Sequence, residues 1–196
     1  MLHDLENIEA YLSALAAALA AINREEIRAA VRVLREAREA GKTIFLMGNG
    51  GSAATASHIA SDLNFWVSHG SARPFKALAL GDSSPVVLAI ANDIRFEDVF
   101  VEQLRNRLEP GDVVVGISGS GNSPNVVRAV EFANGHRAVT LGLCGFDGGR
   151  LKATAQHAIH IQADDMQISE DGHLVVTHIL MRSLKEDPER EGTASF

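Results

Sequence analysis

The first 40 residues repeat hydrophobic positions at helical spacing. Leucine and isoleucine recur at alternating intervals of three and four residues, an a/d pattern held for nearly three heptads. The repeat consists of Leu5, Ile8, Leu12, Leu15, Leu19 and Ile22. It predicts a helix that packs either on its own domain or against another subunit, and the intervening alanines allow close approach on more than one face. Asn23 and Glu26 predict the start of a second helix, which Gly41 ends.

Short apolar runs separated by helix-compatible stretches follow this helical arm (1–40). The runs cover 43–47, 77–80, 113–117, 138–143 and 158–161. Runs that are apolar on both faces are typical of parallel strands covered by helices on both sides. The helix-compatible stretches are 53–67, 85–92, 95–107, 124–134, 149–155 and 169–185. We therefore expect an α/β domain at 41–186, a three-layer sandwich with a mainly parallel five-stranded sheet, before a polar tail at 187–196.

The composition is that of a soluble globular chain. Of 196 residues, 46% are hydrophobic and 22% are charged, which excludes a disordered, collagen-like or disulfide-stapled chain. No apolar run approaches the ~18 to 20 residues that span a bilayer, and acidic residues stand where a secretory leader would be basic. Cys144 is the single cysteine, so no intrachain disulfide can form, and we expect a cytoplasmic protein.

The net charge limits the expected partners. A formal charge of −7 disfavours nucleic acid and anionic membranes, which need clustered lysine and arginine. A small phosphorylated ligand stays compatible with this charge, because backbone amides bind a single phosphate locally.

Two glycine-rich loops follow the first and third predicted strands. The first reads Gly-Asn-Gly-Gly-Ser at 48–52, and the second carries three serines within 116–124. Ligands of parallel α/β folds bind at the carboxyl ends of the strands. Glycines let backbone amides turn toward an anion, and the start of the next helix adds partial positive charge. One such loop is equally well explained as a tight turn, but two at equivalent positions favour an anion site.

The sequence does not match three common functional motifs: the dinucleotide-binding fingerprint, the P-loop and the nucleophile elbow. Gly48, Gly50 and Ala53 match a loose dinucleotide fingerprint, but the acid expected about 20 residues later is missing, and the nearest one after the next strand is Asp82. The chain contains no P-loop sequence. Ser118 lacks the glycine two residues later that a nucleophile elbow requires.

A second group of candidates consists of histidines and carboxylates. His58 and Asp62 are four residues apart, so they share one helix face. The last helix carries Glu170, Asp171, His173 and His178. These residues are explained either as a surface ion pair and a solvated helix start, or as two histidines and two carboxylates that bind one zinc or other first-row divalent ion.

Taken together, these motifs resemble the SIS (sugar isomerase) domain proteins, and within them the bacterial phosphoheptose isomerases. The resemblance extends over nearly the whole chain. It rests on the helical arm, the 48–52 loop, His58-Ile-Ala-Ser-Asp62, Ala91-Asn92-Asp93, Gly111-Asp112-Val113, the 118–123 loop, Asp147-Gly148-Gly149 and the helix from Gly172 to Leu180. It implies a flavodoxin-like α/β fold and homotetramers whose active sites lie between subunits.

The resemblance also implies residue roles. The residues that would cradle the sugar phosphate are Asn49, Gly50, Gly51, Ser52, Ser118, Gly119, Ser120 and Ser123. Asn92 and Asp93 would bind sugar hydroxyls, and Glu170 would also contact the substrate. The metal, which we expect to be zinc, would be held by His58, Asp62, Glu170 and His178. Asp62 and His178 would be the catalytic acid/base pair.

Three positions depart from the family pattern. Asp62 replaces the usual glutamate, Glu170 replaces a glutamine, and Gly119 stands where threonine is common. The shorter Asp62 retracts its carboxylate by about one bond, and a misplacement of about 1 Å can cost on the order of 10²-fold in rate. Because the metal cluster survives and Glu170 gives it a harder, negatively charged ligand in place of glutamine, we expect a variant enzyme rather than a loss of activity.

The expected reaction is aldose–ketose isomerisation through an enediol, most closely that of sedoheptulose 7-phosphate to D-glycero-D-manno-heptose 7-phosphate. Other functions remain open. One is a non-catalytic SIS-domain regulator that binds the replication initiator or senses sugar phosphates, although such a protein would not need the histidine and carboxylate cluster. Another is an isomerase of a different phosphosugar.

Overall fold

The structure, a computed structural model, describes residues 2–185 and contains a single five-stranded parallel sheet within them. The predicted tail at 187–196 lies outside the described residues. The strand order is β2-β1-β3-β4-β5, and every neighbouring pair is parallel. This is the flavodoxin-like order, so the predicted fold class is confirmed. The strands are β1 (Thr43–Met47), β2 (Lys76–Ala79), β3 (Val113–Ser118), β4 (Val139–Cys144) and β5 (His157–His160).

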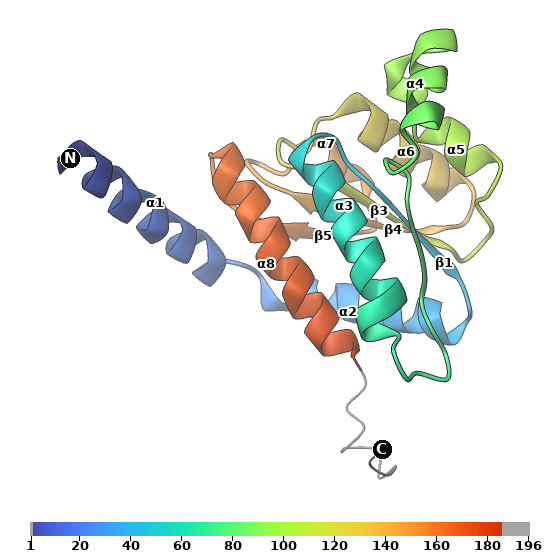
Figure 1. The fold of residues 1–196 in the computed structure, drawn as a ribbon, viewed down its shortest axis with the longest axis horizontal. Coiled ribbons are helices and arrows are strands. Elements are labelled where there is room, and N and C mark those ends of the chain that lie inside the picture. The colour runs from blue at the N-terminus through green and yellow to red at the C-terminus, as the bar shows by residue number, and fades with distance from the viewer. Residues whose placement is uncertain (1, 186–196) are drawn as a thin grey trace, which may run out of the picture.

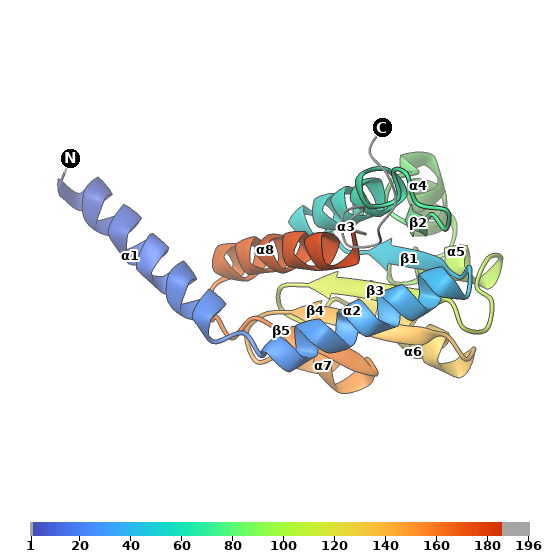
Figure 2. The same ribbon diagram turned by 90° about the horizontal axis from the view of Figure 1, so that it is seen from below.

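Helices cover both faces of the sheet, as Figure 2 shows. The α-helices are α1 (Leu2–Ala20), α2 (Arg24–Glu39), α3 (Gly51–Ser61), α4 (Ser84–Asp93), α5 (Val101–Arg105), α6 (Pro124–Gly135), α7 (Gly149–Thr154) and α8 (Met166–Leu184). Ile44 and Leu46 of β1 pack in the core with α2, α3 and α8. Phe45 and Met47 point to the opposite face and pack with α5, α6 and α7. The apolar strand runs therefore supply side chains to both cores.

Two predicted helices are interrupted in the structure. The predicted helix 53–67 consists of α3 followed by a π-helical turn, η1 (Asp62–Val67). The predicted helix 95–107 consists of a 3-10 turn, η2 (Phe96–Asp98), and the short α5.

The helical arm begins apart from the body and then joins it. Asn23 caps α2 by accepting a hydrogen bond from the Glu25 amide at 3.0 Å, as predicted. Gly41 follows the helix with φ +66°, a left-handed conformation that favours glycine. The Tyr11 hydroxyl of α1 donates to Asp171 of α8 at 2.7 Å. The N-terminal part of α1 extends beyond the other elements (Figure 1).

No helix within residues 2–185 combines the length and the apolar character that a membrane crossing requires.

Candidate active site

The two glycine-rich loops form one cavity at the carboxyl edge of the sheet. They follow β1 and β3, which are neighbours in the sheet, at the position where the strand order reverses and α/β folds bind ligands. The cavity has a volume of about 290 Å³. Its lining residues are Asn49, Gly50, Gly51, Ser52, Ile117, Ser118, Gly119, Ser120, Ser123, Met166 and Glu170. Every residue that we expected to cradle a phosphate therefore lines this cavity.

A pair of amide side chains locks the two loops together. Asn49 of the first loop donates to Asn125 at 2.9 Å, and Asn125 donates back to Asn49 at 2.9 Å. Asn125 is buried at the start of α6. The side-chain amide of Asn49 is thus engaged between the loops, which leaves the backbone amides and the serine hydroxyls as the donors for an anion.

Two of the three serines of the second loop face each other, and the third contacts the loop backbone. The hydroxyls of Ser118 and Ser123 are 3.0 Å apart, and the Ser120 hydroxyl accepts from the Asn122 amide at 3.2 Å. Ser123 occupies the N-cap position of α6 before Pro124, but its side chain makes no capping hydrogen bond. Its hydroxyl instead faces Ser118, at the start of a helix whose dipole favours a negative charge.

His58, Asp62 and His178 converge on one point. His58 and Asp62 come from α3 and its junction with η1, and His178 comes from α8, which packs beside α3 (Figure 1). The Nε2 atoms of His58 and His178 are 3.1 Å apart, and His58 Nε2 is 3.3 Å from Asp62 Oδ2. One ligand atom of each residue lies within 4.8 Å of the others. We refer to these three residues as the triad.

The triad fits a first-row divalent metal ion. It offers two imidazole nitrogens and one carboxylate oxygen, the donor set of many catalytic zinc sites, and leaves a fourth position open. Bonds of about 2.0 to 2.1 Å place two ligands of a tetrahedral ion about 3.3 Å apart. The separations of 3.1 Å between the two histidines and 3.3 Å between His58 and Asp62 are close to this value. Both histidines are exposed and Asp62 is half-buried, so the site is open to solvent in the isolated chain.

Glu170 lies at the phosphate cavity rather than in the triad. Its carboxylate packs over Gly51, where an added Cβ would lie 2.4 Å from Glu170 Oε2. Among the described residues, the group of possible metal ligands contains the triad and not Glu170. The role of Glu170 as a fourth ligand therefore stays a prediction, and its position supports substrate contact.

The other candidate metal ligands on α8, His173 and Asp171, do not join the triad. His173 is 1% exposed, and neither ring nitrogen has a hydrogen-bond partner. Burial lowers its pKa to about 4, so the ring is neutral in the core. Asp171 accepts the hydrogen bond from Tyr11. The spacing of these residues in the sequence allowed them to join a metal site, but the structure does not bring them to the triad.

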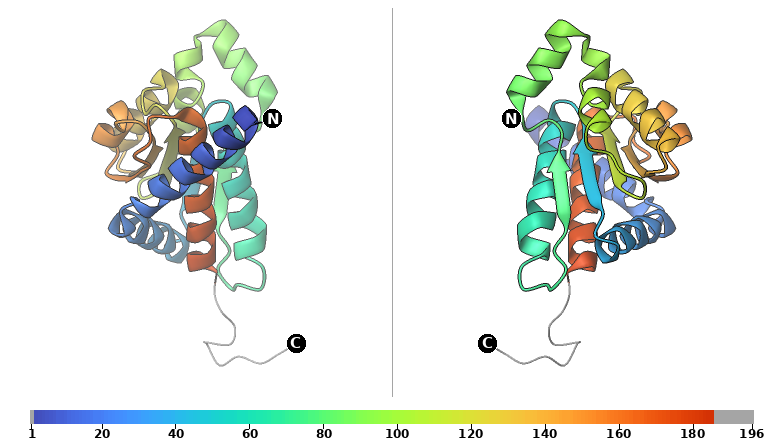
Figure 3. Two further views of the ribbon diagram at one scale, coloured as in Figure 1. Left: turned by 90° about the vertical axis from the view of Figure 1, so that its left-hand side faces the viewer. Right: turned by 90° about the vertical axis from the view of Figure 1, so that its right-hand side faces the viewer.

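Asn92 and Asp93 lie at the end of α4 and do not line the cavity. Both are exposed, and Asn92 donates to Asp93 at 2.8 Å. Helix α4 has no buried residue and stands out from the body (Figure 3). Within the described chain these two side chains are not among the residues that line the glycine-rich cavity.

Two residues of the site were missed at the level of the sequence. Asn125 follows Pro124 in the expected helix, and only its position opposite Asn49 reveals its role. Met166 lines the cavity from the first turn of α8, three residues before the helix start that we expected. The N-cap residue Asp165 was a signal for the earlier start.

Comparison with known proteins places this geometry in a family. Residues 8–145 match the family model described as the SIS domain. The chain is 37% identical over 181 residues to a phosphoheptose isomerase of Geobacter sp. (strain M21), covering 90% of this chain and 93% of that protein. It is 41% identical over 150 residues to the phosphoheptose isomerase of Trichlorobacter lovleyi, covering 75% and 74%.

A solved structure of a phosphoheptose isomerase is also similar to this chain. The phosphoheptose isomerase GmhA from Neisseria gonorrhoeae superposes with a TM-score of 0.85 at 28% identity, covering 92% of this chain and 97% of that one. The chain therefore belongs to the SIS domain family, among relatives that are phosphoheptose isomerases.

Proposed function

We propose that the chain is an aldose–ketose isomerase that interconverts sedoheptulose 7-phosphate and D-glycero-D-manno-heptose 7-phosphate. One observation carries the proposal: helix α3 begins in the glycine- and serine-lined cavity and, together with α8, forms a His/Asp/His triad further along its length. The curated relatives are named phosphoheptose isomerases, which supports this activity. A regulator that only holds a sugar phosphate would need the cavity and not the triad.

The length of α3 connects the two parts of the site. The helix begins at Gly51 in the cavity and reaches His58 seven residues later, about 10 Å along its axis at 1.5 Å per residue. A sugar phosphate bound through its phosphate at the helix start thus extends along α3 toward the triad. This arrangement holds the far end of the substrate while chemistry occurs at its first two carbons.

The triad residues would perform the proton transfer. Asp62 and His178 lie within reach of one another, so one can remove a proton from carbon while the other donates to or accepts from the adjacent oxygen. His58 and the two catalytic residues would hold the metal, which we propose to be zinc. A bound divalent ion supplies electrostatic stabilisation of negative charge on the sugar oxygens.

We also propose a cytoplasmic homotetramer with active sites between subunits. Asn92 and Asp93 would serve as hydroxyl ligands in the site of a neighbouring subunit, because they are exposed and do not line the cavity of their own chain. A neighbouring subunit would also cover the exposed triad and exclude water from it.

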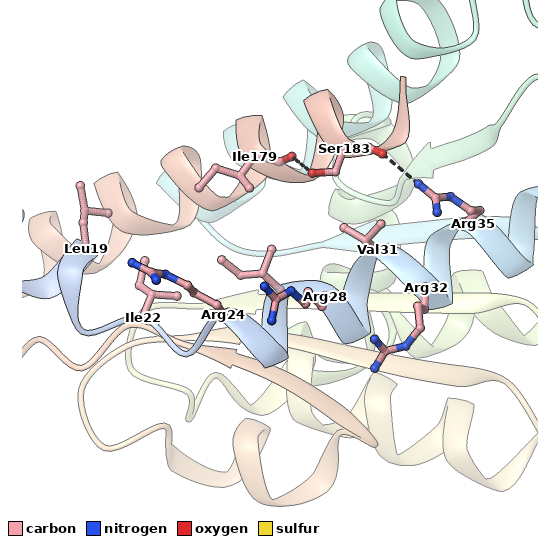
Figure 4. A pocket seen from close by; sticks show the side chains of 10 residues that line it. Leu19, Ile22, Arg24, Arg28, Val31, Arg32, Arg35, Ile179 and Ser183 are labelled. Atoms are coloured by element: carbon pink, nitrogen blue, oxygen red, sulfur yellow. Dashed lines mark hydrogen bonds between the residues drawn. The ribbon is translucent and has the colours of Figure 1, made fainter. Parts of the chain in front are cut away.

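A groove next to α1 offers one surface for this assembly. It has a volume of about 560 Å³ and lies between the end of α1, α2 and α8 (Figure 4). Its residues are Leu19, Ile22, Arg24, Ile27, Arg28, Val31, Arg32, Arg35, Ile179 and Ser183. Apolar side chains thus alternate with four arginines of α2. The groove would take α1 of a second copy, which exposes Ile8 and Leu12 and carries acidic residues but no lysine or arginine.

Replacing His178 by glutamine tests the catalytic proposal. We expect His178→Gln to lower kcat for sedoheptulose 7-phosphate at least 10³-fold, since it removes a proton-transfer group and a metal ligand. The variant should keep the melting temperature of the wild type, because His178 is exposed. His136→Gln, at the exposed end of α6, is the matched control and should retain full activity. Full activity of His178→Gln would refute the assignment.

A chelator experiment and a pull-down separate the alternatives. Chelation of divalent metal should abolish turnover, and zinc should restore it more fully than magnesium, which avoids nitrogen ligands. A regulator would instead show no isomerase activity with or without metal and would capture the replication initiator. Those two results together would show that the chain is a binding protein and not an isomerase.

A further inference from the structure

The chain that follows β4, residues 145–151, is bonded to the second glycine-rich loop at both of its ends. The Gly145 amide donates to the Gly119 carbonyl at 2.8 Å. The Leu151 amide donates to the Gly121 carbonyl at 2.8 Å. Gly119 lines the cavity of the proposed phosphate site. We refer to residues 145–151 as the brace, because their shape sets the position of the loop backbone.

The brace contains a non-glycine residue in a strained conformation. Phe146 has φ +48°, in the left-handed region that disfavours bulky side chains. Such a conformation persists where the surrounding contacts hold it. The Phe146 amide donates to the Ala163 carbonyl at 3.0 Å, and the Phe146 carbonyl lies 2.8 Å from His160 Nε2. Contacts from β5 and from the segment after it therefore hold Phe146 at both its amide and its carbonyl.

The hydrogen-bond partners of His160 fix the orientation of its ring. His160 is the last residue of β5 and is 7% exposed. Its Nε2 faces a carbonyl, which can only accept, so Nε2 carries the proton. Its Nδ1 accepts from Lys152 Nζ at 2.9 Å. The backbone amide of His160 donates to Glu26 of α2 at 3.0 Å. The ring is thus held ready to donate to Phe146.

We propose that His160 is a positioning residue for phosphate binding: its hydrogen bond to Phe146 holds the brace, and the brace holds the second glycine-rich loop. The proposal rests on the phosphate site of the proposed function. His160 is absent from the described residues that line the cavity, so it acts through the backbone and not by contact with the ligand. A site of backbone amides and hydroxyls depends on the directions of its donors, because hydrogen bonds weaken steeply with angle.

The first test measures the Kd for sedoheptulose 7-phosphate by titration calorimetry. His160→Leu fills the space of the ring but cannot donate, and it should raise the Kd about tenfold, as expected for one hydrogen bond of ordinary strength. His160→Gln keeps an N–H donor and should stay within about twofold of the wild type. His157→Leu, on the same strand, is the matched control, since the His157 ring has no hydrogen bond within the described residues. Equal Kd values for His160→Leu and the wild type would overturn the proposal.

A second set of readouts separates positioning from a loss of stability. Inorganic phosphate should lose affinity by the same factor as the sugar phosphate. Binding is measured well below the melting temperature, so reduced stability alone leaves the Kd unchanged. The kcat of His160→Leu at saturation should change less than about threefold, because the triad lies outside the brace. A lower kcat with an unchanged Kd would refute the positioning role. A wild type that binds the sugar phosphate without turnover would refute the isomerase and leave this test valid.

A surface variant tests the same ring without changing the core. Lys152 is exposed, and Lys152→Met removes the donor that orients His160, so the Kd for sedoheptulose 7-phosphate should rise about threefold, less than for loss of the His160 donor itself. Lys76→Met is the matched control, because the Lys76 ammonium is also exposed and donates to the Gly41 carbonyl at 3.1 Å instead. Equal Kd values for both lysine variants would contradict the orientation of the His160 ring by Lys152 and, with it, the proposal.

Discussion

The histidines of α8 show how one helix gives the same residue type opposite roles. His178 faces His58 at the surface, whereas His173 is buried without a hydrogen-bond partner. Five residues at about 100° each rotate the side chain by roughly 140° after full turns are removed, so the two rings point in different directions. The sequence presents both as metal-ligand candidates, and only packing against the sheet separates them.

The buried His173 predicts a pH-dependent stability. Burial lowers its pKa to about 4, below the value of about 6.5 for an unfolded chain. Between these values the unfolded state binds a proton that the native state does not, so the free energy of unfolding falls as the pH falls from about 6.5 to about 4. The loss amounts to about 3 kcal/mol. His173→Leu should flatten this slope in urea titrations, and an unchanged slope would contradict the prediction.

The site residues that the sequence could predict are those placed by local spacing along the chain. His58 and Asp62 are neighbours on one helix, and the glycine-rich loops follow strands, so local spacing places each of them. His178 joins the triad through the packing of α3 and α8, and the family resemblance supplied that pairing. Asn125 and Met166 act through contacts across the fold that no local pattern records.

The sequence predicted where the helical segments lie along the chain, but not that two of them contain π-helical or 3-10 turns. The π-helical η1 begins at Asp62, so the change of helix type falls on a triad residue. π-Helical turns often occur at functional sites. The Ser68 hydroxyl donates to the Leu63 carbonyl at 2.6 Å and accepts from the Phe75 amide at 2.8 Å. These contacts hold the end of the turn and depend on a chain segment beyond it.

At the turn η2, we predict that removing the Asp98 carboxylate lowers the free energy of unfolding. Asp98 is buried and pairs with Arg95 and with Arg128 of α6. Burial alone would raise the pKa of Asp98, but the Arg95 hydrogen bond and the Arg128 charge outweigh it and lower the pKa. Asp98→Ala should cost about 2 kcal/mol, typical of hydrogen bonds to a charged group. Denaturant titration measures this loss.

A matched control variant and a pH series test the contribution of the Asp98 ion pairs with Arg95 and Arg128. Glu102→Ala breaks the more exposed ion pair with Arg105 and should cost less than about 0.5 kcal/mol. Since the folded pKa of Asp98 is lowered, its contribution is complete above the ordinary value near 4 and is lost as the pH falls below it. Equal costs for Asp98→Ala and Glu102→Ala would contradict the role of Asp98 as an anchor of η2.

At the scale of the whole molecule, the sheet was predictable and the surfaces were not. Strand runs that are apolar on both faces require helices on both sides, and parallel strands alternating with helices leave few topologies. The arginine-rimmed groove instead combines α1, α2 and α8, which are distant in the sequence (Figure 4). The heptad pattern indicated a helix that could pair with another subunit, but not the surface that receives it.

Assembly through this groove predicts the effect of a charge reversal. Arg32 of α2 lines the groove, and α1 carries Glu9 beside the exposed Ile8 and no lysine or arginine. Arg32→Glu should weaken association by placing like charges together, and light scattering should show a smaller particle than the wild type. Isomerase activity should fall with it, because a dissociated chain loses the neighbouring groups of its active site. Arg107→Glu, an exposed arginine outside the groove, should change neither. A monomeric wild type, or an Arg32→Glu variant of unchanged mass, would refute docking of α1 in this groove.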